Sequence, residues 1–352
     1  SKRQYGLQIS IGSGCPGNYE IEVIYTDDRR HTPVFYQKNS RLLYCRRKIL
    51  KNQTRKNGQL SSMKKKIAFT AVIFIAPVFI YTVIFRIIPI FFSLILSFTR
   101  YDGFNAPVFN GIQNYKALMF SGEFWNSVIR TLEFSVLVLP LNMLISLVMA
   151  VLINNRVRGI GFFRALYYLP VITPLVAASM IWMWLYDPQY GIFNFFLSLF
   201  SLPPVNFLSN TSTALASVAV MRIWRGVGWN MMIYLAGLQG ISAYLYEAAK
   251  LDGAGTVKQF TKITWPLLRP VHLYVLIVGL ISTLQSFTEM YVMTGGGPLQ
   301  STTTVGMLIY TSAFDYMDMG YACSMSFALG IIIMVLSVIS FTWKKERTEV
   351  SE

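Results

Sequence analysis

Two sets of polar side chains recur at helical spacing inside apolar runs of this sequence. Arg222, Arg225 and Trp229 stand at i, i+3 and i+7, which places them on one face of a helix. A second set follows the same helical spacing further along the chain: Ser282, Gln285, Ser286 and Glu289. Polar groups within apolar helices usually face a cavity or one another. Aromatic rings beside hydroxyl, amide and guanidinium groups suit a sugar, so we expect these residues to line a solute pathway.

The same residues have a structural alternative. Arg225 and Glu289 would pair with each other, or with a partner subunit, to neutralise buried charge. Arg222 would then extend its guanidinium toward the membrane surface. The sequence leaves both interpretations open.

Metal and phosphate chemistry have little support. The few histidines and cysteines lie far apart, without a Cys-x-x-Cys pair, at His31, His272, Cys15, Cys45 and Cys323. Gly295–Pro298 is glycine-rich, but no Lys-Ser or Lys-Thr follows it, so this segment is a turn and not a phosphate-binding loop. We expect no catalytic residue, no metal, no cofactor and no ATPase site of the chain's own.

The composition indicates a membrane protein. The chain has 352 residues, of which 54% are hydrophobic and 13% charged, whereas soluble domains carry about 25% charged residues. A soluble fold of this size has too little interior for so much apolar surface. The net charge of +15 lies largely in the first residues and at the ends of apolar runs, so we expect no nucleic acid partner. These features predict an all-α, polytopic membrane protein.

Six apolar segments are predicted to cross the bilayer as helices. They lie at about 67–98, 131–153, 165–186, 214–238, 271–290 and 321–343. The first is longer than a bilayer core requires and is expected to tilt, protrude or kink at Pro89. The third contains Pro170 and Pro174.

The basic residues of the connections predict the orientation. Thirteen Lys and Arg flank the spans on one side and three, Arg100, Lys116 and Arg130, on the other. Because cytoplasmic connections are enriched in Lys and Arg, both termini and the connection 240–270 are predicted to be cytoplasmic. The predicted location is the cell (cytoplasmic or inner) membrane, with the lipid bilayer as surroundings.

Residues 1–62 differ from the rest of the chain. They contain twelve Lys and Arg, four acids and no apolar run long enough to span, and Met63 is followed by three lysines. We expect 1–62 to be a basic leader, non-native or disordered, and 63–352 to form the transmembrane domain. The alternative is a basic cytoplasmic tail that touches anionic lipid.

The connection 240–270 mixes charged residues with apolar ones. Glu247–Ala249 opens a good helix-forming segment, and Asp252–Gly255 interrupts it. A second, amphipathic stretch places apolar side chains at Val257, Phe260 and Ile263. The pattern predicts a helix–turn–helix lying against the membrane surface.

This connection resembles the EAA motif of permease subunits of ABC importers. The matching positions, at the family's spacing, are Glu247, Ala248, Ala249, Gly253, Ile263 and Pro266. Trp265 stands where the family has leucine, a departure that keeps an apolar anchor. The flanking residues look like the maltose-type, sugar-importing branch, and the similarity extends over roughly residues 65–345.

The resemblance implies that the loop couples the chain to separate ATPase subunits. The implied coupling residues are Glu247, Ala248, Ala249, Asp252, Gly253, Ile263 and Pro266. The implied partners are two cytoplasmic ATPase subunits, a second and distinct permease subunit and an extracytoplasmic solute-binding protein. The implied substrate is a carbohydrate, and we expect an oligosaccharide. The family also places substrate contacts on the fourth and fifth spans.

Three other functions would each require different features of the sequence. A permease for a glycerol phosphate ester would use the paired guanidiniums of Arg222 and Arg225. An integral membrane enzyme would need His, Asp, Glu or Cys residues that converge at one depth, and within the predicted spans the acids are Glu133 and Glu289, far apart in the sequence. A secondary transporter would have no use for a coupling loop.

Overall fold

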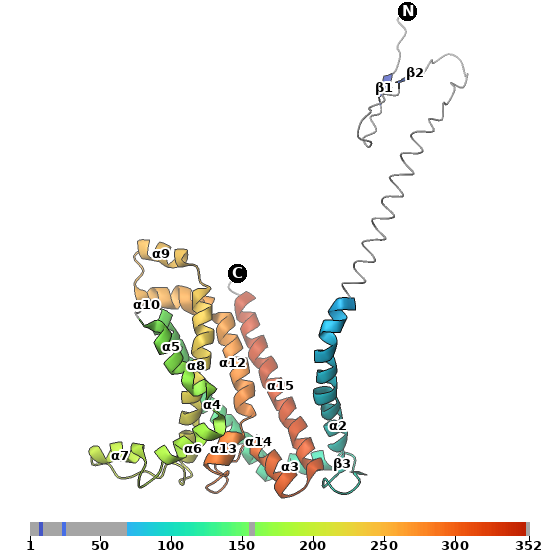
Figure 1. The fold of residues 1–352 in the computed structure, drawn as a ribbon, viewed down its shortest axis with the longest axis vertical. Helices are drawn as coiled ribbons and strands as arrows, with labels where there is room; N and C mark the ends of the chain where they lie inside the picture. The colour runs from blue at the N-terminus through green and yellow to red at the C-terminus, as the bar shows by residue number, and fades with distance from the viewer. Residues whose placement is uncertain (1–6, 10–22, 26–68, 155–158, 350–352) are drawn as a thin grey trace, which may run out of the picture. The chain divides into compact units, whose positions relative to one another are not determined.

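The computed structural model is mainly helical (Figure 1). The described part of the chain comprises residues 7–9, 23–25, 69–154 and 159–349. The chain divides into two compact units, Ser1–Ile87 and Ile88–Glu352. In the first unit, strands β1 (Leu7–Ile9) and β2 (Val23–Tyr25) pair antiparallel. The rest of the predicted leader lies outside the described residues, so the leader assignment remains a prediction.

The second unit begins with a series of helices interrupted by one short strand pair. Its helices before residue 240 are α2 (Ile88–Leu96), α3 (Gln113–Phe120), α4 (Gly122–Asn154), α5 (Ile160–Ile172), α6 (Leu175–Leu185), α7 (Ile192–Leu199) and α8 (Ala214–Gln239). In the loop after α2, strands β3 (Thr99–Arg100) and β4 (Val108–Phe109) pair antiparallel.

The remaining segments complete a bundle. They are α9 (Ala243–Leu251), α10 (Thr256–Gln259), the π-helical η2 (Phe260–Thr264), α11 (Trp265–Leu267), α12 (Arg269–Leu284), α13 (Thr288–Met293), α14 (Val305–Tyr310), the π-helical η3 (Thr311–Asp315) and α15 (Met319–Glu349). The long helices α4, α8, α12 and α15 run between the two ends of the unit and pack against one another. One end carries α9 and α10, and the other carries α3, α7, α13 and α14 (Figure 1).

Three predicted spans are confirmed as helices long and apolar enough to cross a membrane. They are Phe69–Leu96, Gly122–Asn154 and Met319–Thr342. In the first, a π-helical segment, η1 (Val83–Ile87), directly precedes α2, which has Pro89 as its second residue. Because proline lacks an amide hydrogen and its ring crowds the carbonyl of the preceding turn, a widened turn is favoured there.

The third and fifth predicted spans are helical but not continuous. The axes of α5 and α6 differ by 97°. Between them Thr173 is extended (φ −66°, ψ 130°), as expected for a residue before proline. The fifth, predicted as continuous over 271–290, ends at Leu284 and resumes at Thr288. A continuous helix is therefore wrong at these two places, and the count of six spans remains a prediction.

The fourth predicted span is α8, which lies in the centre of the bundle. It is 26 residues long, about 39 Å at 1.5 Å per residue. Thirteen of its residues are buried. Its two arginines lower its mean hydropathy, but neighbouring helices bury much of its surface, so less of α8 faces the lipid.

Polar contacts join α4 to α8. Asn142 Nδ2 donates to the Ile223 carbonyl at 3.1 Å, and Ser146 Oγ donates to the Val227 carbonyl at 3.1 Å. Asn230 Nδ2 in turn donates to Asn142 Oδ1 at 2.6 Å. Helices in lipid gain little hydrophobic energy from meeting each other, so such interhelical hydrogen bonds and close packing hold them together.

Gly228 lies at a close approach of α5 to α8, and its substitution should be strongly destabilising. A Cβ at this position would lie 2.1 Å from the Tyr167 carbonyl oxygen. We expect Gly228→Ala to lower the unfolding free energy by about 1–3 kcal/mol or more, because two backbones must separate. Thermal unfolding in detergent measures the effect. Gly330→Ala on α15, where no described atom lies within 4 Å, is the matched control and should be neutral. Equal losses in both variants would contradict this explanation.

Candidate functional site

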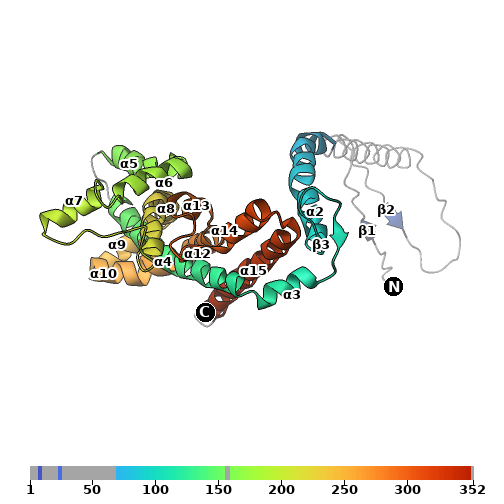
Figure 2. The same ribbon diagram turned by 90° about the horizontal axis from the view of Figure 1, so that it is seen from below.

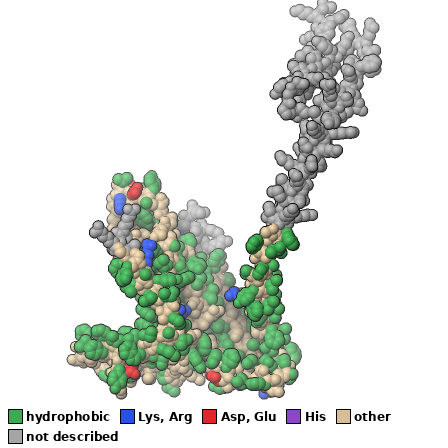
Figure 3. All heavy atoms as spheres, viewed as in Figure 1, with side chains coloured by type: hydrophobic (Ala, Val, Ile, Leu, Met, Phe, Trp, Pro, Cys, Tyr) green, Lys and Arg blue, Asp and Glu red, His purple; other side chains and the backbone are tan. Residues whose placement is uncertain are grey.

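The helix–turn–helix predicted for 240–270 is present. α9, α10, η2 and α11 fold into a projection beyond the ends of α8 and α12 (Figure 1). Basic and acidic side chains are visible at this projection, and hydrophobic side chains cover much of the described surface elsewhere in that view (Figure 3). The charge and the projecting shape make the loop the most prominent polar feature at its end of the bundle.

A Schellman turn ends α9. The Gly253 amide donates to the Lys250 carbonyl at 3.0 Å, and the Ala254 amide donates to the Ala249 carbonyl at 2.8 Å. This pattern requires a left-handed residue after the cap, and Gly253 has φ +75°. The interruption predicted at Asp252–Gly255 is therefore confirmed, and Gly253 is the residue that makes it possible.

Two glycines of this loop offer a matched comparison. Gly253 has φ +75° and Gly255 has φ −67°, and no described atom lies within 4 Å of a Cβ built on either. We expect Gly253→Ala to cost about 1–2 kcal/mol, the price of a left-handed alanine, and to speed local hydrogen exchange in α9 roughly 5- to 30-fold. Gly255→Ala should leave the exchange unchanged. Equal exchange in both variants would show that the turn does not hold α9.

One face of α9 is exposed along its length. Tyr244, Glu247 and Leu251 stand at i, i+3 and i+7 and are all exposed, Leu251 to 90%. We call these three residues the α9 stripe. Sequence reasoning identified Glu247 but missed Tyr244 and Leu251, although their spacing was visible. A carboxylate between two apolar side chains is suited to a cleft that contains a basic group.

The other predicted coupling residues divide by exposure. Asp252 is exposed, whereas Ala248, Ala249, Ile263 and Pro266 are partly buried. Within the predicted amphipathic stretch, Val257 is exposed, whereas Phe260 and Ile263 are partly buried. Val257 lies in α10, and the π-helical η2 begins at Phe260.

Side-chain contacts tie this loop to the bundle. Tyr246 Oη and Thr264 Oγ1 are 2.9 Å apart, which joins α9 to η2. The ring centroids of Trp265 and His272 are 4.4 Å apart, and His272 Nδ1 is 3.1 Å from Tyr234 Oη on α8. Thr264, His272 and Tyr234 are buried. These contacts form a continuous packed path from α9 to α8 and α12, so a movement of α9 would be transmitted to both helices.

Arg222 connects α8 to both sides of the break between α12 and α13. Its Nη2 donates to Ser282 Oγ at 2.5 Å, and its Nε lies 3.6 Å from Glu289 Oε1. Glu289 is 2% exposed, so its partner must be inside the protein. The alternative pairing of Arg225 with Glu289 is not observed: Arg222 takes that place and does not extend to the surface.

Arg225 lies at the other helix break. Its Nη2 donates to the carbonyls of Val171 and Thr173, each at 3.5 Å. Carbonyls at a helix C-terminus lack intrahelical donors and carry partial negative charge, so a cation is favourable there. The two arginines of α8 therefore each contact one broken span.

The remaining predicted pathway residues do not share one continuous face. The helix break at Gln285 separates Ser282 from Glu289 along the chain, and Arg222 brings the two together again. Ser286 is buried, and its carbonyl accepts from Thr304 Oγ1 at 2.7 Å. Trp229 and Gln285 are exposed. Only these last two members of the sets are freely accessible in the described chain.

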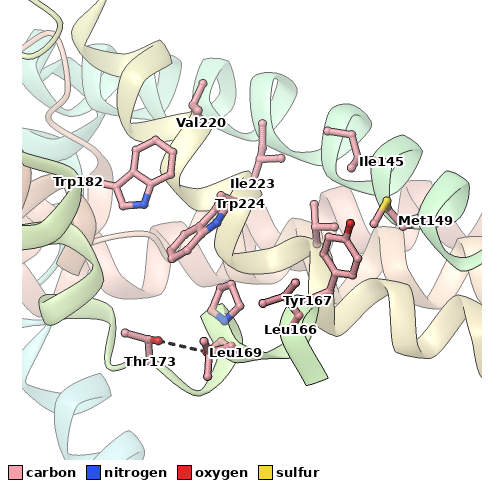
Figure 4. Close-up of a pocket in the computed structure, with 13 residues that line it drawn as sticks. Ile145, Met149, Leu166, Tyr167, Leu169, Thr173, Trp182, Val220, Ile223 and Trp224 are labelled. Atoms are coloured by element: carbon pink, nitrogen blue, oxygen red, sulfur yellow. Dashed lines mark hydrogen bonds between the residues drawn. The ribbon is translucent and has the colours of Figure 1, made fainter. Parts of the chain in front are cut away.

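An apolar cavity lies on the opposite face of α8. It has a volume of about 690 Å³ between α4, α5, α6 and α8. Trp182 and Trp224 lie beside it, with ring centroids 5.5 Å apart, and Leu166, Tyr167 and Leu169 line its α5 side (Figure 4). The only side-chain hydrogen bond drawn there runs from Thr173 Oγ1 to the Leu169 carbonyl. The cavity is apolar, and sequence reasoning did not identify it.

Metal ligands do not gather in the described residues: no group of three or more His, Cys, Asp or Glu side chains is present among them. Cys323 is partly buried in α15, and Cys15 and Cys45 lie outside the described residues.

Comparison with known proteins identifies the family. Residues 142–345 match the family "Binding-protein-dependent transport system inner membrane component". The chain is 34% identical over 287 residues to the trehalose/maltose transport system permease protein MalF of Thermococcus litoralis, covering 81% of this chain and 95% of that protein. It is 32% identical over 275 residues to the sn-glycerol-3-phosphate transport system permease protein UgpA of Shigella flexneri, covering 78% and 93%.

A solved structure supports the fold. A chain of a bacterial ABC transporter involved in the import of the acidic polysaccharide alginate superposes with a TM-score of 0.70 at 22% identity, covering 81% of this chain and 98% of that chain. From the family match and the similarity to these permeases, the chain belongs to the binding-protein-dependent transport system inner membrane components, the permease subunits of ABC transporters.

Proposed function

We propose that this chain is a transmembrane permease subunit of an ATP-driven importer that moves a carbohydrate, expected to be an oligosaccharide, across the cell membrane. The observation that carries the proposal is the α9 stripe, an exposed carboxylate between two apolar side chains on a projecting loop. The permeases that the chain resembles are named for trehalose and maltose, for lactose and for sn-glycerol-3-phosphate.

The α9 stripe would seat in a cleft of a separate ATPase subunit. Glu247 would meet a basic residue there, and the small Ala248 and Ala249 would allow close approach. Asp252 and Gly253 keep the turn that presents the helix, and Ile263 and Pro266 anchor the second half of the loop. ATP-driven motion of the ATPase would pass through Trp265 and His272 to α8 and α12. The ATPase site would lie on the partner and not on this chain.

The complete transporter would contain two ATPase subunits, a second and distinct permease and an extracytoplasmic solute-binding protein. The thirteen-to-three distribution of basic residues supports a cytoplasmic position for α9–α11. The C-terminal end of α15 lies at the same end of the bundle as α9 (Figure 1), as that topology requires. The opposite end would receive the solute from the binding protein.

The solute would pass along the polar face of α8 and the α12–α13 break. Trp229 and Gln285 would contact it, since both are exposed. Arg222, Arg225, Ser282, Ser286 and Glu289 would border the same path, where they hold the two broken spans against α8. Alternating access would then rock these spans around α8.

A glycerol phosphate ester is the second candidate, because UgpA is a relative. A phosphate would need guanidinium groups free to bind it. Arg222 already faces Glu289 and Ser282, and Arg225 donates to two backbone carbonyls. The occupied arginines favour an uncharged carbohydrate.

Uptake by the reconstituted transporter tests the proposal. The full chain, with the subunits that purify with it and the binding protein, would be placed in proteoliposomes with ATP inside. We expect ATP-dependent accumulation of radiolabelled malto-oligosaccharides and none of sn-glycerol-3-phosphate. Accumulation of the phosphate ester alone would select the second candidate, and ATP-independent uptake would exclude both.

A further inference from the structure

Helix α7 turns an apolar face away from the protein. Its exposed apolar side chains, here called the α7 face, are Ile192, Phe195, Phe196, Leu199 and Phe200 at the helix end, and Ser198 at the edge of this face is also exposed. They cover one side of the helix, and the partly buried Phe193 and Leu197 lie on the other side with the buried Asn194. A helix at a water-facing surface shows the reverse arrangement, with its polar side chains outward.

The inner side of α7 is firmly held. Asn194 Nδ2 donates to the carbonyls of Asp187 and Val205 at 3.3 and 3.1 Å, and its Oδ1 accepts from the Val205 amide at 2.9 Å. The Phe193 ring lies 5.1 Å from that of Tyr186, centroid to centroid. The outward direction of the α7 face is therefore fixed by the fold and is not the result of a loose helix.

The sequence around α7 carries no charge. Between Asp187 and Arg222 there is no Asp, Glu, Lys or Arg. Phenylalanine side chains without neighbouring charges are poorly suited to water. A solute-binding protein that docks and leaves would return this face to water between encounters, so the occupant must be permanent.

The location of α7 points to that occupant. α7 follows α6, which ends a bent pair apolar enough to be membrane-embedded and exposes Met180, Ile181 and Trp184. It lies across the direction of α8 and α15 at the end opposite α9, and it projects sideways from the bundle (Figures 1 and 2). The α7 face thus continues the apolar surface of the spans at their end.

We propose that α7 is an interfacial helix whose apolar face is inserted into the bilayer, at the boundary of headgroups and acyl chains in the leaflet opposite the α9 end. Helices with one apolar face lie parallel to the membrane surface, with that face buried at the boundary of headgroups and acyl chains. α7 would set the depth at which the bent α5–α6 pair sits. The inference depends on membrane insertion, and neither the substrate nor the coupling to ATPase enters it.

Site-directed spin labelling tests this. Cysteines at Phe196 and Leu199, in a background without Cys15, Cys45 and Cys323, would carry nitroxides in the full chain with its co-purifying subunits in lipid nanodiscs. Leu299, 91% exposed in the loop between α13 and α14, is the matched Leu→Cys control. Accessibility to oxygen, which partitions into lipid, is compared with accessibility to the water-soluble complex NiEDDA. Gel filtration confirms that each labelled variant remains assembled, and Phe195 replaces any position that does not.

We expect several-fold higher oxygen-to-NiEDDA accessibility at 196 and 199 than at 299. High NiEDDA accessibility at 196 and 199 would place the α7 face in water and overturn the proposal. Protection from both reagents would overturn it as well, because a protein subunit would then cover the face. The accessibility measurement does not depend on transport, so a failure of the proposed sugar uptake would not change its outcome.

Discussion

Glu247→Lys is expected to abolish ATP-driven uptake while the protein remains folded in the membrane. Glu247 is exposed in the middle of the α9 stripe, so lysine there disturbs no internal contact. Opposite a basic group of an ATPase subunit, the reversed charge replaces attraction by repulsion. Losing one partner of a desolvated charge pair costs about 2–5 kcal/mol, so we expect at least a roughly 30-fold weaker association. Uptake in proteoliposomes and co-purification of the ATPase measure the two consequences.

Two further variants make this result specific. Lys262→Glu also reverses an exposed charge of the same loop, but on η2 and away from the α9 stripe, and should retain uptake. Glu247→Gln removes the charge without reversing it and should show an intermediate loss. If Glu247→Lys transports normally, the coupling role of α9 is excluded. If Lys262→Glu fails equally, the loop responds to net charge and not to a specific contact.

Glu289→Ala is expected to be the most destabilising single change in the bundle. It leaves the Arg222 guanidinium without its buried carboxylate, and removing one member of a buried ion pair costs about 3–5 kcal/mol. We expect a large fall in thermal stability and in the yield of assembled transporter. Differential scanning fluorimetry in detergent and gel filtration measure both.

A double variant and a matched single variant separate structure from transport. Arg222→Met with Glu289→Met removes both charges and should recover much of the stability, as apolar replacements of buried pairs often do. Trp229→Ala, at an exposed position on the same helix, should keep stability and lower uptake. A stable Glu289→Ala protein with impaired uptake would instead assign Glu289 to solute contact. Unchanged uptake in Trp229→Ala would remove Trp229 from the pathway.

The fold of the loop that carries α9–α11 could largely be predicted from local sequence. Glycine at 253 predicts an interruption because few other residues accept positive φ, and the structure shows φ +75° there. The helix-forming residues before it and the amphipathic stretch after it are also local signals. The exposure of Val257 could not be predicted this way, since it depends on which surfaces of the folded loop pack against the bundle.

The polar residues in the spans were found by spacing, but their partners were not. A helical repeat placed Ser282 and Glu289 on one face, whereas the chain breaks between them and Arg222 contacts both. Spacing along one helix carries no information about which neighbouring helix approaches or how close it lies. The same limitation hid the Gly228–Tyr167 contact and the apolar cavity beside Trp182 and Trp224.

By itself, the sequence determined that this chain is a membrane-embedded helical protein with one distinctive polar loop, because composition and short-range periodicity depend only on nearby residues. Tertiary structure alone decided that Arg222 meets Glu289, that Arg225 meets the carbonyls of a broken helix, and that α7 faces outward. Each depends on backbone breaks that bring distant segments together. A charge buried in an apolar medium pairs with whichever opposite charge or polar group the packing places next to it.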